Sequence, residues 1–218
     1  MCRQDRGRQP FADGEDSPAD KIARPRVLGC NVDAMSLPTL IVVSGPPGSG
    51  KTTLAHSIAA AVGCPAICRD EIKEGMAHAR PGFTPGPGDE LTMRTLSAFF
   101  GVLDLLLTAG VTTVAEAAFQ DRVWRPRLEA LGNLATIRVV HCVVAAEVAF
   151  GRIAARKDVT PARRAHTDPS PREAADYARR HLAFDRISVD APCLEVDTTD
   201  GYRPGLGQIV GFINEPRH

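Results

Sequence analysis

A glycine-rich turn in this chain has the residue types and the spacing of a phosphate-binding loop. It matches the pattern G-x-x-x-x-G-K-[ST] with Gly45, Pro46, Pro47, Gly48, Ser49, Gly50, Lys51 and Thr52. Glycines let a backbone wrap closely around an anion with several N–H groups pointing inward. The lysine supplies a mobile charge for the terminal phosphates of a nucleotide, and the threonine hydroxyl can ligate Mg²⁺. The pattern therefore predicts a site for ATP and Mg²⁺.

The segments on either side of this turn are those that a phosphate-binding loop requires. Residues 39–44 form a short apolar run rich in β-branched side chains, which predicts a strand buried on both faces. Residues 50–62 place Leu54 and Ile58 on one face of a predicted helix that Gly63 ends. A helix beginning at the loop would present its free N–H groups and positive dipole end to phosphate. A chance glycine turn does not explain this order of elements.

Two acidic residues stand where predicted strands end. Asp70 follows the short strand 65–68, and Glu116 follows the strand 111–115. Ligands of open α/β sheets bind beyond the carboxyl ends of the strands. Phosphoryl transfer needs one carboxylate near the accepting hydroxyl and another near Mg²⁺. We predict that Asp70 is the catalytic base, a role compatible with capping a helix, and that Glu116 serves the metal or the substrate.

The segment 152–186 is rich in arginine. It holds nine Lys and Arg residues against five Asp and Glu residues, a local charge of +4. Arg152 and Arg156 are four residues apart and therefore share a helix face. Guanidinium groups suit the negative charge on a moving phosphoryl group. We predict a catalytic lid with Arg152 and Arg156, and further nucleotide contacts from Arg163 and Arg164.

Length and composition favour one globular domain. The chain has 218 residues, 44% hydrophobic and 24% charged, and 26 positive residues balance 26 negative ones. This balance argues against a surface dedicated to nucleic acid. A membrane span is not expected, because no run of 18 apolar residues occurs. The six cysteines lack the spacing of zinc ligands, so we expect reduced thiols in a cytoplasmic protein.

Strands and helices alternate along the chain after residue 36. Strands are predicted at 39–44, 65–68, 111–115, 137–144 and 193–196, and helices at 50–62, 70–79, 89–109, 121–131, 146–157, 170–186 and 205–214. The alternation predicts an α/β fold in which helices flank a five-stranded parallel sheet. Residues 1–36 are polar and lack apolar periodicity, which predicts a flexible tail before a domain at 37–218.

Together these features resemble the small P-loop kinases. The features are the phosphate loop extended to Thr53, the segment 69–72, Glu116 and the arginine-rich segment. This group includes chloramphenicol phosphotransferase, zeta-toxin-like kinases, gluconate and shikimate kinases and the kinase domain of polynucleotide 5′-kinases, and many relatives carry an AAA-family ATPase label. The resemblance covers about residues 37–215 and implies a P-loop NTPase fold with an arginine-rich lid.

The resemblance also implies roles for individual residues. The segment 195–199 is similar to the C-terminal strand and loop of chloramphenicol phosphotransferase, and in such kinases this loop lies near the adenine. Thr53 belongs to the nucleotide-binding loop. The other implied roles are those of Asp70 as base, Arg152 and Arg156 in the lid, and Thr198 and Thr199 near the adenine.

The function expected from these residues is transfer of the ATP γ-phosphoryl group to a hydroxyl of a small molecule, a metabolite or an antibiotic. Residues 70–110, between the second and third strands, would build the acceptor pocket. Two alternatives stay open. A 5′-hydroxyl polynucleotide kinase would need a basic track with stacking aromatics, and aromatics are only 5% of this chain. A non-catalytic ATP-binding switch would move with nucleotide state. We expect a monomer or homodimer without nucleic-acid or membrane partners.

Overall fold

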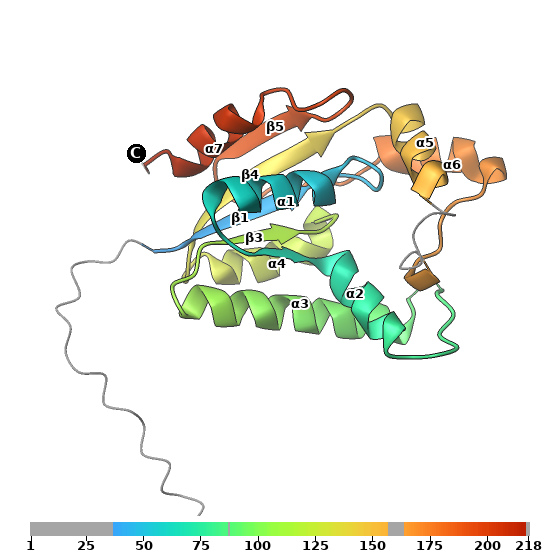
Figure 1. The fold of residues 1–218 in the computed structure, drawn as a ribbon, viewed down its shortest axis with the longest axis horizontal. Helices are drawn as coiled ribbons and strands as arrows, with labels where there is room; N and C mark the ends of the chain where they lie inside the picture. The colour runs from blue at the N-terminus through green and yellow to red at the C-terminus, as the bar shows by residue number, and fades with distance from the viewer. Residues whose placement is uncertain (1–36, 87, 157–163, 217–218) are drawn as a thin grey trace, which may run out of the picture. The chain divides into compact units, whose positions relative to one another are not determined.

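The computed structural model describes residues 37–216, apart from residue 87 and residues 157–163 (Figure 1). The tail predicted at 1–36 lies outside the described residues, and so does Arg163.

A five-stranded parallel sheet forms the centre of the described domain, which confirms the predicted fold class. Its strands are β1 (Thr39–Ser44), β2 (Ala66–Cys68), β3 (Thr113–Glu116), β4 (Thr136–Val143) and β5 (Cys193–Asp197). The strands lie in the order β2-β3-β1-β4-β5, and every pairing is parallel. The carboxyl ends of all five strands therefore meet at one edge of the sheet, where the phosphate loop begins.

Helices cover both faces of the sheet (Figure 1). They are α1 (Lys51–Val62), α2 (Arg69–His78), α3 (Glu90–Thr108), α4 (Asp121–Leu131), α5 (Ala146–Arg156), α6 (Ala174–Leu182) and α7 (Leu206–Asn214). Alternate residues of β1 point to opposite faces. Leu40 and Val42 pack in a cluster with α3 and α4, whereas Ile41 and Val43 pack in a cluster with α1 and α7. The central strand is therefore buried on both sides, as its apolar run predicts.

The helix predicted at 170–186 is the element that differs most from its prediction. The structure has a 3₁₀ turn, η3 (Pro171–Glu173), followed by α6, which ends at Leu182. Between α6 and β5 the chain runs without helical structure, because Ile187 is buried in the cluster on the α3 and α4 face. Burying that side chain outweighs continuation of the helix.

Helix α3 packs one apolar face against the domain. By length and composition it is a candidate membrane span, the one helix among the described residues that passes this test. Its Phe99, Leu103 and Leu107 are buried in the domain, and Phe99 packs edge-on against Trp124. Burial of one face is typical of an amphipathic helix that packs on a sheet, so the apolar composition of α3 is weak support for a membrane span.

Candidate functional site

The phosphate loop folds tightly between β1 and α1. Gly45 has φ 149° and Gly48 has φ 78°, which are backbone conformations that favour glycine. A Cβ atom at Gly48 would lie 2.5 Å from the carbonyl oxygen of Ala149 in α5, and one at Gly45 would lie 2.6 Å from that of Cys142. The loop is therefore pressed against its neighbours in a way that only glycine permits at both positions.

The first turn of α1 leaves its backbone N–H groups open to a ligand. Gly50 occupies the N-cap position without a side-chain cap, and the first turn holds no acidic residue. The N-terminus of a helix carries four N–H groups without intrahelical partners and the positive end of the helix dipole. An anion fits this position best.

Lys51, Thr52 and Glu116 converge beside this helix start. The Thr52 hydroxyl donates a hydrogen bond to Glu116 Oε2 over 3.0 Å, and Lys51 Nζ lies 3.7 Å from Glu116 Oε1. Lys51 Nζ also donates to the carbonyl of Pro46 over 3.3 Å. A hydroxyl and a carboxylate are hard oxygen ligands of the kind Mg²⁺ prefers. The donor set at Thr52 and Glu116 therefore fits that ion, and its binding there stays a prediction.

Glu116 is almost fully buried, with 3% of its surface exposed. Burial raises the pKa of its carboxyl, although the charge of Lys51 acts in the opposite direction. Asp70 and Glu71 raise the pKa further by their negative charge. A cation placed beside Glu116 would relieve this unfavourable burial of charge.

Asp70 lies in the first turn of α2, directly after β2. Its carboxylate is about half exposed and pairs with Arg69 Nη1 over 2.8 Å. Partial burial works to raise the pKa of Asp70, but the charges of His166, Arg69 and Lys51 outweigh it and the pKa is lowered. Asp70 is therefore an ionised acceptor of hydrogen bonds at neutral pH, within electrostatic reach of Lys51. It does not occupy the N-cap position of α2, which Cys68 takes.

Arg152 lies beside the phosphate loop, where one of its guanidinium nitrogens would be 3.7 Å from a Cβ atom at Gly50. Arg152 Nη2 donates to the carbonyl oxygens of Thr198 and Thr199 over 2.6 and 3.0 Å, and Arg156 Nε donates to the carbonyl of Arg152 over 3.1 Å. Arg164 is exposed. In the described residues Arg152 thus holds the loop after β5 beside the phosphate loop, and the predicted lid contact with a γ-phosphate stays a prediction.

The loop after β5 contacts the phosphate loop directly. Thr198 is buried, and its hydroxyl donates to the carbonyl of Ser49 over 2.7 Å. The Ser49 hydroxyl is buried and has no hydrogen-bond partner among the residues that the structure describes. Pro47 and Thr53 are exposed. The phosphate loop and the loop after β5, which the sequence predicts to contact the nucleotide, therefore lie together, although 149 residues separate Ser49 from Thr198.

Two residues near this site carry no signal in the sequence. The Tyr177 hydroxyl of α6 donates to the carbonyl of Pro47 over 2.6 Å, which joins α6 to the phosphate loop. His166 lies close enough to Asp70 to lower its pKa, and its Nε2 lies 3.1 Å from Glu74 Oε1. A single tyrosine on an amphipathic helix and a histidine in a loop have no distinctive spacing, so only the fold reveals their positions.

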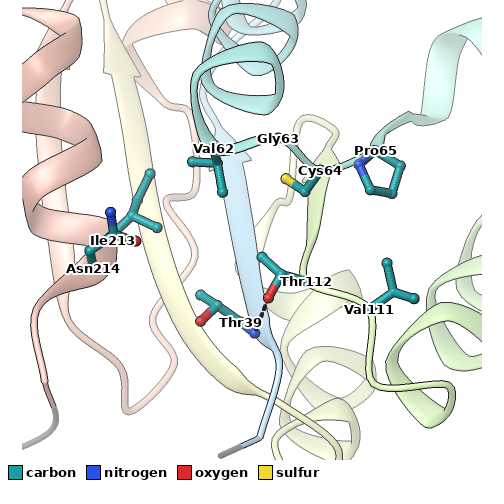
Figure 2. Close-up of a pocket in the computed structure, with 9 residues that line it drawn as sticks. All are labelled: Thr39, Val62, Gly63, Cys64, Pro65, Val111, Thr112, Ile213 and Asn214. Atoms are coloured by element: carbon teal, nitrogen blue, oxygen red, sulfur yellow. Dashed lines mark hydrogen bonds between the residues drawn. The ribbon is translucent and has the colours of Figure 1, made fainter.

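A pocket of about 290 Å³ lies at the opposite end of the sheet. Figure 2 shows its lining between the start of β1, the end of α1 and the segment before β3. The backbone N–H of Thr39 donates to the Thr112 hydroxyl there over 3.1 Å. Because the pocket lies at the amino end of β1, it is separate from the phosphate loop at the carboxyl end of that strand.

Comparison with known proteins places the chain in a family. Residues 40–183, more than half of the chain, match the family model described as AAA domain. The chain belongs to this family. Among proteins with curated descriptions, none matches this AAA domain.

Solved structures share the fold of this AAA domain. A candidate kinase from Chloroflexus aurantiacus J-10-fl is 23% identical with a TM-score of 0.74, and the match covers 84% of this chain and all of that one. A sugar kinase from Janibacter sp. HTCC2649 is 24% identical with a TM-score of 0.51, covering 80% and 90% of the two chains. The Pnkp1/Rnl/Hen1 RNA repair complex contains a chain that is 14% identical with a TM-score of 0.51, covering 74% and 53%.

These likenesses confirm the resemblance to small P-loop kinases at the level of the fold. The family implies nucleotide binding, and the phosphate loop of this AAA domain has the open N–H groups and the lysine that binding requires. The site combines this anion-binding end with a pair of hard oxygen ligands and a separate ionised carboxylate. Such a combination can bind a polyphosphate and hold a second reactant near its end.

Proposed function

We propose that this AAA domain transfers the γ-phosphoryl group of ATP to a hydroxyl of a small molecule. The observation that carries the proposal is the convergence of Lys51, Thr52 and Glu116 at the phosphate loop, with Asp70 within electrostatic reach of Lys51. A protein that only bound nucleotide would need the loop and its helix. A second carboxylate at the neighbouring strand end is what an acceptor hydroxyl requires.

The phosphate loop would bind the nucleotide. Its inward N–H groups and the start of α1 hold the phosphates, and Lys51 exchanges its contact with the Pro46 carbonyl for the β- and γ-phosphates. Thr52 and Glu116 would hold Mg²⁺, which supplies positive charge against the phosphate oxygens. Arg152 fixes the loop at Thr198 and Thr199, where we place the adenine.

Asp70 would orient the acceptor hydroxyl and receive its proton. Its lowered pKa keeps the carboxylate ionised at neutral pH, so it accepts a hydrogen bond from the hydroxyl without prior deprotonation. A weak base suffices because the transition state of phosphoryl transfer is loose, and positioning supplies most of the catalysis. Helices α2 and α3 contact each other after Asp70, and we propose that the segment they form binds the acceptor.

A direct test is a screen of hydroxyl-bearing metabolites and antibiotics with ATP and Mg²⁺, following ADP release and labelled product. Lys51→Ala should abolish turnover while the circular dichroism spectrum and melting temperature stay near those of the wild type. Ser57→Ala, on the same helix, is the matched control and should keep activity, because the Ser57 hydroxyl donates to the Thr53 carbonyl within α1. Near-native activity of Lys51→Ala would contradict the proposal.

The same screen separates two other functions. Phosphorylation of a 5′-hydroxyl oligonucleotide, with binding that weakens steeply as salt rises, would indicate a polynucleotide kinase. ATP binding that Lys51→Ala abolishes, without any phosphorylated product, would indicate a nucleotide-dependent switch.

A further inference from the structure

Three potential metal ligands of different chemistry meet beside the phosphate loop. They are the imidazole of His56 in α1, the thiol of Cys68 at the end of β2 and the carboxylate of Glu71 in the first turn of α2. His56 Nε2 lies 3.8 Å from Cys68 Sγ and 2.7 Å from Glu71 Oε1. All three ligand atoms lie within 4.8 Å of one another. Because the residues come from three elements, the fold itself assembles the cluster.

The cluster is a neighbour of the predicted Mg²⁺ position and shares no ligand with it. His56 follows Thr52 by four residues on α1, so the two side chains lie on one face of that helix, one turn apart. Cys68 is the register partner of Glu116 in the pairing of β2 with β3. The cluster therefore lies one helical turn and one strand away from Thr52 and Glu116.

The ligand types favour a borderline or soft divalent ion. A Zn²⁺ ion bonds to sulfur at about 2.3 Å, to imidazole nitrogen at about 2.0–2.1 Å and to carboxylate oxygen at about 2.0–2.2 Å. Two ligands of one tetrahedral ion with these bond lengths lie roughly 3.3 to 3.8 Å apart. Mg²⁺ prefers oxygen ligands and is a poor match for a thiolate and an imidazole.

The observed distances need little adjustment to hold such an ion. The contact between His56 and Cys68 already has the required spacing. The contact between His56 and Glu71 must open by less than an ångström, and both side chains are about half exposed. This exposure leaves a path from solvent to the cluster. Cys68 is 2% exposed and is fixed by the sheet.

A surface ion pair explains only part of this arrangement. An exposed histidine and glutamate often pair, and such a surface pair contributes little to stability. The pair does not account for a buried thiol whose Sγ lies 3.8 Å from His56 Nε2 and within 4.8 Å of a Glu71 carboxylate oxygen. We propose that His56, Cys68 and Glu71 form a Zn²⁺ site with three protein ligands and an open fourth position.

Ligation would have a local structural consequence. The Cys68 thiol loses its proton to solvent when the sulfur bonds to the metal ion. Ligands at positions 68 and 71 would then flank Asp70 and fix the turn that carries it. Cysteine spacing along the sequence does not reveal this site, because a single cysteine takes part.

The test uses the full chain, freed of metal and titrated with Zn²⁺ and, separately, with Co²⁺. We expect one equivalent of Zn²⁺ per chain by equilibrium dialysis, a higher melting temperature on binding, and a thiolate-to-cobalt charge-transfer band with Co²⁺. Cys68→Ser should abolish the band, and both Cys68→Ser and His56→Gln should weaken Zn²⁺ binding at least about tenfold. His56 is exposed, so its replacement keeps the fold even where Cys68→Ser does not.

Matched controls locate the site. Cys64→Ser changes a cysteine outside the cluster, and a Cys2→Ser and Cys30→Ser double variant removes two cysteines before the domain. Thr52→Ala removes the predicted Mg²⁺ ligand. All three should keep the zinc affinity of the wild type. Three results would overturn the proposal. They are absence of zinc binding by the wild type, wild-type zinc affinity in the His56→Gln and Cys68→Ser variants, and loss of zinc binding in a control variant but not in these two.

Discussion

The Thr52 hydroxyl donates a hydrogen bond to Glu116 Oε2 over 3.0 Å, although 64 residues separate the two in the sequence. The bond joins the first turn of α1 to the end of β3. It exists because β3 lies next to β1, so that Glu116 is the register partner of Val43, just before the phosphate loop. The fold thereby places a carboxylate beside the phosphate loop, where we propose that it holds the metal ion of the nucleotide.

Removal of the Glu116 carboxylate should lower the apparent affinity of the enzyme for Mg²⁺. We expect Glu116→Gln to raise the Mg²⁺ concentration for half-maximal ADP release about 10- to 100-fold, because the amide keeps the shape and loses the charge. Glu129→Gln, on the exposed surface of α4, is the control and should match the wild type. An unchanged Mg²⁺ dependence in an active Glu116→Gln protein would remove Glu116 from the metal site.

Replacement of the predicted base should affect turnover rather than nucleotide binding. We expect Asp70→Asn to lower kcat by roughly 10²- to 10⁴-fold, the usual contribution of a positioned base, and to leave the Kd of ATP unchanged. The pKa of Asp70 lies below its usual value of 3.8, so kcat of the wild type should show no titration of this group near neutral pH.

The control for Asp70→Asn is Asp104→Asn, which changes an exposed carboxylate on α3. Both variants should be measured for kcat with saturating substrates and for ATP affinity by calorimetry. Asp70 would lose its assigned role if its replacement left kcat intact while weakening ATP binding.

The sequence predicts the strands, the helices and the phosphate loop because their signals are local. The apolar run at β1 and the glycines at 45, 48 and 50 each describe their own segment. Helix boundaries fall within one or two residues of their predictions where a glycine such as Gly63 ends the helix. The end of α6 is different, since a distant core cluster that buries Ile187 decides it.

The sequence does not predict which segments become neighbours. The order of the strands determines that Cys68 and Glu116 lie side by side, and no local pattern encodes that order. The same limit applies to Arg152, whose spacing predicts a lid residue and whose side chain donates to the carbonyls of Thr198 and Thr199. Backbone carbonyls have no sequence signature, so only the fold reveals these partners.

Two glycines with the same backbone conformation provide a matched test of the phosphate loop. Gly48 and Gly63 have φ values of 78° and 80°, but a Cβ at Gly48 would lie 2.5 Å from the Ala149 carbonyl, whereas one at Gly63 meets nothing within 4 Å. We expect Gly63→Ala to lower the free energy of unfolding by about 1–2 kcal/mol, the cost of a left-handed conformation. Gly48→Ala should cost more, because α5 or the loop must also move.

A displacement of the phosphate loop in Gly48→Ala should also change its affinity for ATP. Gly48→Ala should weaken ATP binding in addition to its effect on stability, while Gly63→Ala should bind ATP like the wild type. Denaturant unfolding and calorimetry give the two quantities. Equal losses of stability in both variants would mean that the close approach of Gly48 to Ala149 carries no energetic weight.

The buried pair of Asp89 and Lys73 predicts how stability depends on pH. Lys73 Nζ donates to Asp89 Oδ2 over 2.9 Å, and the backbone N–H of Thr92 donates to Oδ1 over 2.8 Å. Burial works to raise the pKa of Asp89, but these hydrogen bonds and one from the Gly86 N–H outweigh it and lower the pKa to about 2. Because the folded state binds this proton more weakly than the unfolded state, the pair stabilises the fold above pH 3.8 and loses its effect as pH falls toward 2.

Asp89→Asn should therefore lower the free energy of unfolding by about 1–3 kcal/mol at neutral pH, because it leaves the buried Lys73 ammonium without a charged partner. The difference from the wild type should stay constant down to about pH 4 and shrink below it, where the wild-type carboxylate is protonated in the unfolded chain. Glu90→Gln is the control, because Glu90 pairs with Arg80 and Arg94 on the exposed surface and such pairs contribute little. A difference between Asp89→Asn and the wild type that did not change between pH 7 and pH 3 would show that the charge of Asp89 does not stabilise the junction of α2 and α3.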